Sequence, residues 1–79
     1  MMDRDEIKTI VKESIRTETG YSGPIEEQMS ATEIEGWDSL AHVRIMFRID
    51  LNLGTQIDIN QTYAIETICE LIDLFLTEL

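Results

Sequence analysis

The segment Gly36-Trp37-Asp38-Ser39-Leu40 contains the side chains in this sequence that are best placed to take part in chemistry. Asp38 is a residue type preferred as a helix N-cap, which makes Ser39 the first residue of a predicted helix. Backbone N–H groups at a helix start lack intrahelical partners and lie at the positive end of the helix dipole, so they can hold a phosphate. Gly36 allows a sharp turn just before the helix. The pattern fits a serine that another protein modifies, but these local features alone favour an ordinary well-capped helix start.

Few other residues offer chemistry. The sequence contains one histidine, His42, and one cysteine, Cys69, which are too few ligands for a zinc site. It has no glycine-rich phosphate-binding loop. Cys69 falls on the apolar face of the last predicted helix, where we expect an inert buried thiol. We predict that His42 is a surface contact residue rather than a catalytic one.

Three helices are predicted to position these residues. Their apolar residues recur with the helical period in three segments: residues 4–17, 39–53 and 66–78. Asp3 and Glu6 form a capping box for the first segment, while Asp38 and Gly54 mark the two ends of the second. The apolar face of the second segment is wider than the stripe of a surface helix. We therefore expect a central helix that is covered on more than one side.

The stretch between the first two helices, residues 18–38, is predicted to be a long loop because glycine and proline punctuate it. A loop of this length is usually held by its own apolar residues. Its candidate anchors are Ile25, Met29, Ile34 and Trp37. A short helical turn is expected near Ser30–Ile34.

Residues 55–64 connect the second and last long helices. Ile57 and Ile59 are expected to be apolar anchors, and Asn60 is expected to cap a short turn that holds Tyr63. The predicted fold is therefore all-α: a small four-helix bundle of three long helices and one short helix, with a long loop between helices 1 and 2. The chain has the length of one domain, residues 1–79.

The charge of the chain is strongly acidic. Sixteen acidic residues and six basic ones give a formal net charge of −10, all of it carried by residues 17–79. Within the neutral first 16 residues, four bases form a ridge that we expect to be a solvated face, paired at most with distant carboxylates: Arg4, Lys8, Lys12 and Arg16. An acidic surface repels the phosphates of nucleic acids and anionic lipids and speeds encounters with basic proteins. We therefore expect no nucleic-acid partner and no membrane partner.

The location of the protein is expected to be cytoplasmic. The chain begins with a polar, acidic segment rather than a signal peptide. No apolar run approaches the ~20 residues needed to span a bilayer. The single cysteine leaves no internal disulfide.

In its context, the Ser39 segment resembles the phosphopantetheine attachment motif of the acyl and peptidyl carrier protein family. That family has Asp-Ser-Leu at the start of its second helix, after a long loop. Here Asp38-Ser39-Leu40 is followed along one predicted helix by Val43, Ile45, Met46 and Phe47. The resemblance covers the whole chain, because the length, the acidity, the helix order, the Leu53-Gly54 boundary and the Ile57/Ile59 pair also match.

The resemblance implies a carrier that does no catalysis itself. Ser39 would receive 4'-phosphopantetheine from coenzyme A through a phosphopantetheinyl transferase, and Asp38 would help to hold the metal ion in that enzyme's active site. The thiol of the arm would be loaded by an acyl- or aminoacyl-activating ligase. It would carry an acyl, polyketide or aminoacyl group as a thioester to downstream synthase enzymes, with the carrier acting as a monomer. The residues matching partner-contact positions are Trp37, Leu40, His42, Val43 and Arg44, with Ile45 or Met46 deeper in.

The second predicted helix departs from the fatty-acid carriers of this family, in which that helix is strongly acidic. Here it carries His42, Arg44 and Arg48, with Asp50 as its only acid. Trp37 before the Asp-Ser pair is also more typical of carriers in polyketide, peptide or other specialised pathways. The resemblance therefore favours a specialised biosynthetic pathway.

Two alternatives remain open. The Asp-Ser-Leu tripeptide also resembles the Gly-Asp-Ser-Leu esterases, with His42 one helical turn after Ser39, although Trp37 interrupts that motif. Such an esterase would need a base within hydrogen-bond reach of the serine, and oxyanion donors. The other alternative is an acidic interaction module that binds a partner without any modification of Ser39.

Overall fold

The computed structural model describes residues 2–79. Within these residues the regular secondary structure is entirely helical, and no strand occurs. The elements are α1 (Arg4–Thr19), the 3-10 helix η1 (Ala31–Glu33), α2 (Ser39–Leu53), α3 (Ile59–Thr62) and α4 (Ile68–Thr77). The prediction of an all-α fold with three long helices and one short one is confirmed. No helix in residues 2–79 combines the length and the apolar character that crossing a membrane requires.

The first two long helices begin where the sequence predicts. The Asp3 carboxylate accepts from the Glu6 N–H at 2.9 Å, and the Glu6 carboxylate accepts from the Asp3 N–H at 3.5 Å, which completes the capping box. α2 runs from Ser39 to Leu53, as predicted, and ends at Gly54 with a positive φ of 70°. Local capping chemistry is therefore enough to place both helices.

The two later helices differ slightly from the prediction. α4 begins at Ile68 rather than residue 66, because the Thr67 side chain caps it by accepting from the Glu70 N–H at 3.2 Å. α3 is capped by Asp58, which accepts from the Asn60 N–H at 3.0 Å. The prediction that Asn60 is the cap is wrong, because the carboxylate two residues earlier already satisfies this N–H group.

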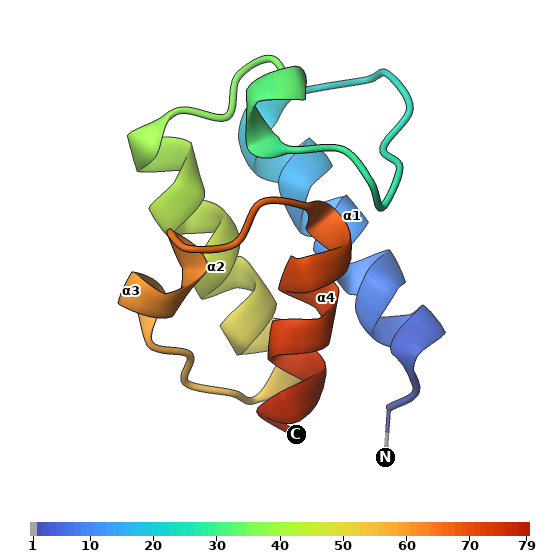
Figure 1. Cartoon of the computed structure of the whole chain (residues 1–79), viewed down its shortest axis with the longest axis vertical. Coiled ribbons are helices and arrows are strands. Elements are labelled where there is room, and N and C mark those ends of the chain that lie inside the picture. The colour runs from blue at the N-terminus through green and yellow to red at the C-terminus, as the bar shows by residue number, and fades with distance from the viewer. Residues whose placement is uncertain (1) are drawn as a thin grey trace.

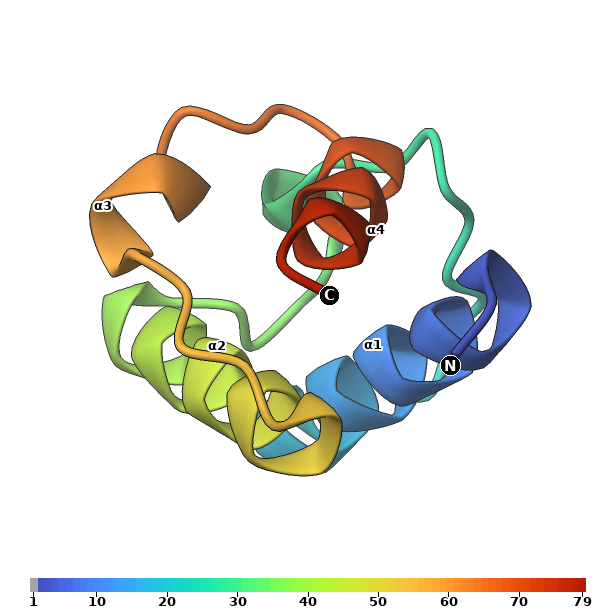
Figure 2. The same cartoon turned by 90° about the horizontal axis from the view of Figure 1, so that it is seen from below.

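The core lies between the three long helices. α1 packs against both α2 and α4, and Figure 1 shows the short α3 at the outer edge of the molecule on the side of α2. Seen from below, α1 and α2 lie along one side and α4 lies opposite them (Figure 2). The fully buried apolar side chains include Ile7, Val11, Ile15, Ile45, Met46, Ile49, Leu71, Ile72 and Phe75.

The connection between α1 and α2, residues 20–38, is fixed to the start of α4 and to the core. The main-chain carbonyls of Glu27 and Met29 accept from the first N–H groups of α4, on Cys69 at 2.8 Å and Ile68 at 3.0 Å. Two of the predicted anchors, Ile25 and Ile34, are buried, and Met29 and Trp37 pack partly buried against the same core. The connection therefore provides acceptors for the first backbone N–H groups of α4, which have no partner within the helix.

The basic ridge of α1 holds this connection in place. Arg4 and Lys8 pair with the Glu27 carboxylate at 2.7 and 3.1 Å. Arg16 donates to the Gly23 carbonyl at 2.8 Å. The hydrogen bond from Arg4, followed by that from Lys8, lowers the pKa of Glu27 to about 2. The expected pairing with distant carboxylates is confirmed for Arg4 and Lys8, whereas Arg16 donates to a main-chain carbonyl of the connection.

The outer face of α2 is open to solvent. Its exposed apolar side chains are Leu40 at 58%, Phe47 at 70% and Leu51 at 86%. The buried residues of α2 lie on the opposite face, which meets α1. Nothing in residues 2–79 packs over this face. The expectation of a helix covered on more than one side is still confirmed, because α1 packs against α2 and the His42 side chain of α2 is buried against Trp37 and Thr62.

Candidate functional site

Ser39 lies at the first position of α2 and is exposed. Within residues 2–79, its hydroxyl makes no hydrogen bond, and neither do the backbone N–H groups of Ser39 and Leu40. The next N–H group, on Ala41, donates to the Asp38 carboxylate at 2.8 Å. The site therefore combines an accessible hydroxyl with two free donors at the positive end of a 15-residue helix.

Gly36 shapes the approach to Ser39. Its φ of +93° lies in the region that favours glycine. A Cβ at this position would also meet the carbonyl oxygen of Thr19 at 2.6 Å. Gly36 thus lets the connection turn tightly against the end of α1 immediately before Trp37 and Asp38.

The predicted contact residues do not share one environment. Leu40 and Arg44 are exposed on the side of α2 that faces solvent, and Val43 is half-buried at its edge. Arg44 makes no ion pair within the described residues, whereas Arg48 pairs with Glu18 at 2.7 Å. Ile45 and Met46, predicted to lie deeper, are buried in the core. Of the predicted contact residues, Leu40 and Arg44 are therefore exposed on α2, with the half-buried Val43 beside them.

His42 departs from the prediction. Its side chain is buried, with 9% exposed, so the prediction of a surface contact residue is wrong. The ring accepts from the Trp37 indole N–H at 3.1 Å and bonds to the Thr62 hydroxyl at 2.7 Å. It also stacks on Tyr63, with ring centroids 4.5 Å apart. The half-buried Trp37 and the turn after α3 cover the face of α2 on which His42 lies.

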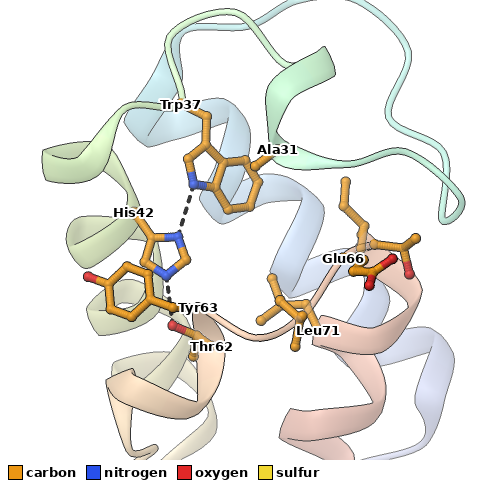
Figure 3. A pocket seen from close by; sticks show the side chains of 10 residues that line it. Ala31, Trp37, His42, Thr62, Tyr63, Glu66 and Leu71 are labelled. Carbon is orange, nitrogen blue, oxygen red and sulfur yellow. Dashed lines mark hydrogen bonds between the residues drawn. The ribbon is translucent and has the colours of Figure 1, made fainter.

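A pocket of about 200 Å³ opens beside this group (Figure 3). Its lining includes Trp37, two residues before Ser39, and His42, one turn after it. Thr62 and Tyr63 border it from the end of α3, and Ile68 and Leu71 border it from α4. The pocket is therefore mainly apolar and lies next to the segment that presents Ser39.

Burial sets the protonation state of His42. Loss of solvation lowers the pKa of the imidazole below its ordinary value of 6.5. Both ring nitrogens are used by Trp37 and Thr62, and no hydrogen bond joins His42 to Ser39. His42 is therefore not placed to act as a base for Ser39, which removes the residue on which the esterase alternative rested.

Cys69 lies at a polar boundary rather than on a purely apolar face. Its thiol is half-buried, 3.3 Å from the Arg4 guanidinium and near Asp73. Burial, followed by the Asp73 charge, raises the pKa of the thiol. A raised pKa keeps the sulfur protonated near neutral pH, which agrees with the expectation of an unreactive cysteine.

Some residues of the site could not be found by local sequence patterns. Thr62 and Tyr63 meet His42 from 20 and 21 residues away, and no spacing rule predicts that contact. Phe47 and Leu51 did carry a signal, because they fall with Leu40 and Arg44 on the side of α2 opposite the buried residues Ile45 and Ile49.

Comparisons with known proteins supply no relative: no family model, no curated protein and no solved structure matches this chain.

Proposed function

We propose that this protein is a carrier of the acyl or peptidyl carrier type, holding 4'-phosphopantetheine on Ser39. The observation that carries the proposal is the state of Ser39: an exposed hydroxyl without a hydrogen bond to any of residues 2–79, at the first position of α2 and directly after the capping Asp38. The long connection before α2 and the exposed helix after it support the same function.

The residues around Ser39 fit this group. The arm is joined through a phosphodiester, and the free N–H groups of Ser39 and Leu40 would lie next to its negative charge. No acidic residue other than Asp38 lies within the first turn of α2, and the Asp38 carboxylate already faces the Ala41 N–H. An anion on Ser39 is therefore compatible with its local charges.

The attachment itself is a phosphoryl-group transfer. The Ser39 oxygen forms a new bond to the phosphorus that carries the pantetheine arm in coenzyme A. The bond from that phosphorus to the nucleotide half breaks, and 3',5'-ADP leaves with the electron pair. The hydroxyl proton passes to the phosphopantetheinyl transferase, whose metal ion Asp38 would help to hold. When bound, the arm supplies a thiol that carries a cargo as a thioester.

The carrier needs no catalytic site of its own, because partner enzymes act on the cargo. An acyl- or aminoacyl-activating ligase loads the thiol, and synthase enzymes use the thioester. Tethering raises the effective concentration of the cargo at each partner's site without tight protein–protein binding. We propose that the protein works in this way as a monomer in the cytoplasm.

The partner surface is the exposed side of α2. Leu40 and Arg44 lie on it with Val43 at its edge, and Phe47 and Leu51 extend it along the helix. This side carries apolar residues and an arginine, while the chain as a whole has a net charge of −10. The partners of fatty-acid carriers recognise an acidic second helix, and this helix is not acidic. We therefore propose partners from a specialised pathway.

The test is a labelling reaction with a fluorescent coenzyme A analogue, magnesium and a broad-specificity transferase. The expected result is one label per chain, mapped to Ser39 by peptide mass spectrometry and lost in Ser39→Ala. Ser22→Ala is the matched control, because Ser22 is exposed but lies outside any helix. A label on any residue other than Ser39 would contradict the proposal.

A second candidate is an interaction module that works without modification. The observation that favours it is the apolar stripe on α2, because Phe47 and Leu51 are largely exposed and lie beyond the first turn, where Ser39 is. This candidate predicts that Ser39→Ala leaves every activity of the protein intact in cells, whereas Phe47→Ser abolishes it. The carrier function predicts loss of activity in Ser39→Ala.

A further inference from the structure

His42 joins three segments that are distant in sequence. It belongs to the first turns of α2, and its ring meets Trp37 from the connection before α2 and Thr62 at the end of α3. Figure 3 shows the imidazole between these two partners, with the Tyr63 ring beside it. No other side chain in residues 2–79 links all three segments by hydrogen bonds.

The partners of His42 fix where its proton lies. An indole nitrogen can only donate, so the bond from Trp37 Nε1 requires a lone pair on His42 Nδ1. The proton is therefore on Nε2, which donates to the Thr62 hydroxyl at 2.7 Å. The Thr62 hydroxyl in turn donates to the Ile59 carbonyl at 2.6 Å. Every donor in this series of hydrogen bonds has one acceptor, and the complete series forms only while the imidazole is neutral.

A second proton on the imidazole would break the hydrogen bond between Trp37 and His42. It would occupy the Nδ1 lone pair and leave the ring N–H facing the Trp37 N–H, two donors with no acceptor between them. The bond to Thr62 would survive, because Nε2 donates in both states of the ring. The charged ring would also be drawn toward water from its buried position, since burial opposes charge.

No surrounding charge compensates for this proton. Tyr63 stacks on the ring and Glu66 lines the neighbouring pocket, and the ionisable residues nearest to His42 in the chain are Asp38 and Arg44. The other ionisable residues of these elements line neither the ring nor the pocket: Arg48 and Asp50 of α2, Glu33 of η1, Glu35, Asp58, and Cys69, Glu70 and Asp73 of α4. The Asp38 carboxylate bonds to the Ala41 N–H, and Glu66 lies across the pocket from His42 in Figure 3. α4 and η1 present apolar side chains to the pocket, among them Leu71 and Ala31. Accordingly, burial alone, with no charge–charge contribution, lowers the pKa of His42.

We propose that His42 is a positioning residue: while neutral it latches the Trp37–Ser39 segment and α3 onto α2, and on taking up a proton it releases the Trp37–Ser39 segment but keeps its hydrogen bond to Thr62 at the end of α3. Trp37 lies two residues before Ser39, so its release changes how the Ser39 hydroxyl is presented. The latch is a property of the fold and does not require that Ser39 is modified.

The chain offers a direct test, because it has one histidine and one tryptophan. The imidazole and indole N–H signals can each be followed by NMR from about pH 8 to about pH 4.5, with Trp37 fluorescence and circular dichroism in parallel. The expected result is an imidazole midpoint below 6.5. The indole signal and the fluorescence change with that same midpoint, while the helical dichroism stays constant.

Two variants separate the ends of the latch. Trp37→Phe removes the donor that stabilises the neutral ring, so the His42 midpoint should rise by about half a pH unit or more. Thr62→Val removes an acceptor that serves the charged ring at least as well, so the midpoint should fall or stay unchanged. His42→Asn offers a carbonyl acceptor near the position of Nδ1 and cannot titrate, so its Trp37 fluorescence should be pH-independent.

Three results would overturn the latch. The first is an imidazole midpoint at or above the ordinary value, with no change at Trp37. The second is a change at Trp37 that has a different midpoint from the imidazole or persists in His42→Asn. The third is loss of helical dichroism together with the imidazole titration, because the transition would then be global unfolding. The wild-type titration decides the matter even if a variant does not fold.

Discussion

At the scale of single residues, the Ser39 side chain does not support the fold. Its side chain is exposed and its hydroxyl makes no hydrogen bond within residues 2–79. Ser39→Ala should therefore change the free energy of unfolding by less than about 0.5 kcal/mol. Urea denaturation followed by circular dichroism measures this change. A larger loss would mean that the serine supports the fold, and the functional effect of the variant could not then be assigned to a missing modification.

Gly36, unlike Ser39, is needed for the fold. Gly36→Ala would put a Cβ 2.6 Å from the Thr19 carbonyl and force alanine into a left-handed backbone. Adopting that backbone alone costs about 1–2 kcal/mol, and the contact adds to it, so we expect a loss of about 2 kcal/mol or more.

The matched control for Gly36 is Gly54→Ala, where φ is also positive but nothing lies within 4 Å. The two variants share the backbone penalty and differ in the contact with Thr19. Thermal and urea unfolding of both should show the greater loss for Gly36. Equal losses would show that the turn before Ser39 does not press against α1.

Which residues of the site can be predicted depends on how local their interactions are. Asp38, Ser39 and the cap between Asp38 and Ala41 follow from adjacent residues, so the sequence is sufficient to place them. The burial of His42 depends on Thr62 and Tyr63, which reach it only after α3 has folded back onto α2. No helical period or capping rule contains that information.

At the scale of elements, Glu27 joins the connection to two helices. Its carbonyl accepts from Cys69 at the start of α4, and its carboxylate pairs with Arg4 and Lys8 of α1. The helix boundaries could be predicted from capping residues, but this junction could not. It needs a carboxylate from one segment, two bases from another and a main-chain bond to a third.

The junction at Glu27 has a pH dependence whose sign follows from its ion pairs. The pKa of Glu27 falls from an ordinary 4.5 to about 2 in the folded chain. The contribution of the carboxylate to stability is complete above pH 4.5 and is lost as the pH falls toward 2. Glu27→Gln should therefore destabilise the protein at neutral pH and flatten its stability profile in that acidic range.

Urea midpoints at a series of pH values measure this effect. Glu33→Gln is the control, because Glu33 is exposed and makes no ion pair in residues 2–79. The assignment fails if Glu27→Gln and the wild type lose stability in parallel between pH 4.5 and 2.

At the scale of the whole molecule, charge and apolar surface are segregated. The net charge is −10, yet the exposed side of α2 offers Leu40, Phe47 and Leu51 around Arg44, which forms no ion pair with any of residues 2–79. If partners dock on this side, Phe47→Ser should weaken transfer of cargo to or from them about tenfold or more, because buried aromatic anchors carry much of an interface's energy.

That effect is measured as kcat/KM for loading or transfer of the cargo by a partner enzyme. Tyr63→Ser is an instructive comparison, because Tyr63 is also exposed, at 57%, but lies outside α2. A loss confined to Phe47→Ser supports docking on α2. Equal losses in both variants contradict it, and so does no loss in either.

The carrier function rests on the chemistry of one oxygen atom, and intact mass measures that chemistry most directly. The purified chain is incubated with coenzyme A, magnesium and each of two phosphopantetheinyl transferases of different specificity. The carrier function predicts the gain of one phosphopantetheine, absent from Ser39→Ala and retained in Ser22→Ala, with one new thiol that reacts with a thiol reagent. A folded wild-type chain that gains no mass with either enzyme, or that gains it equally in Ser39→Ala, would contradict the account.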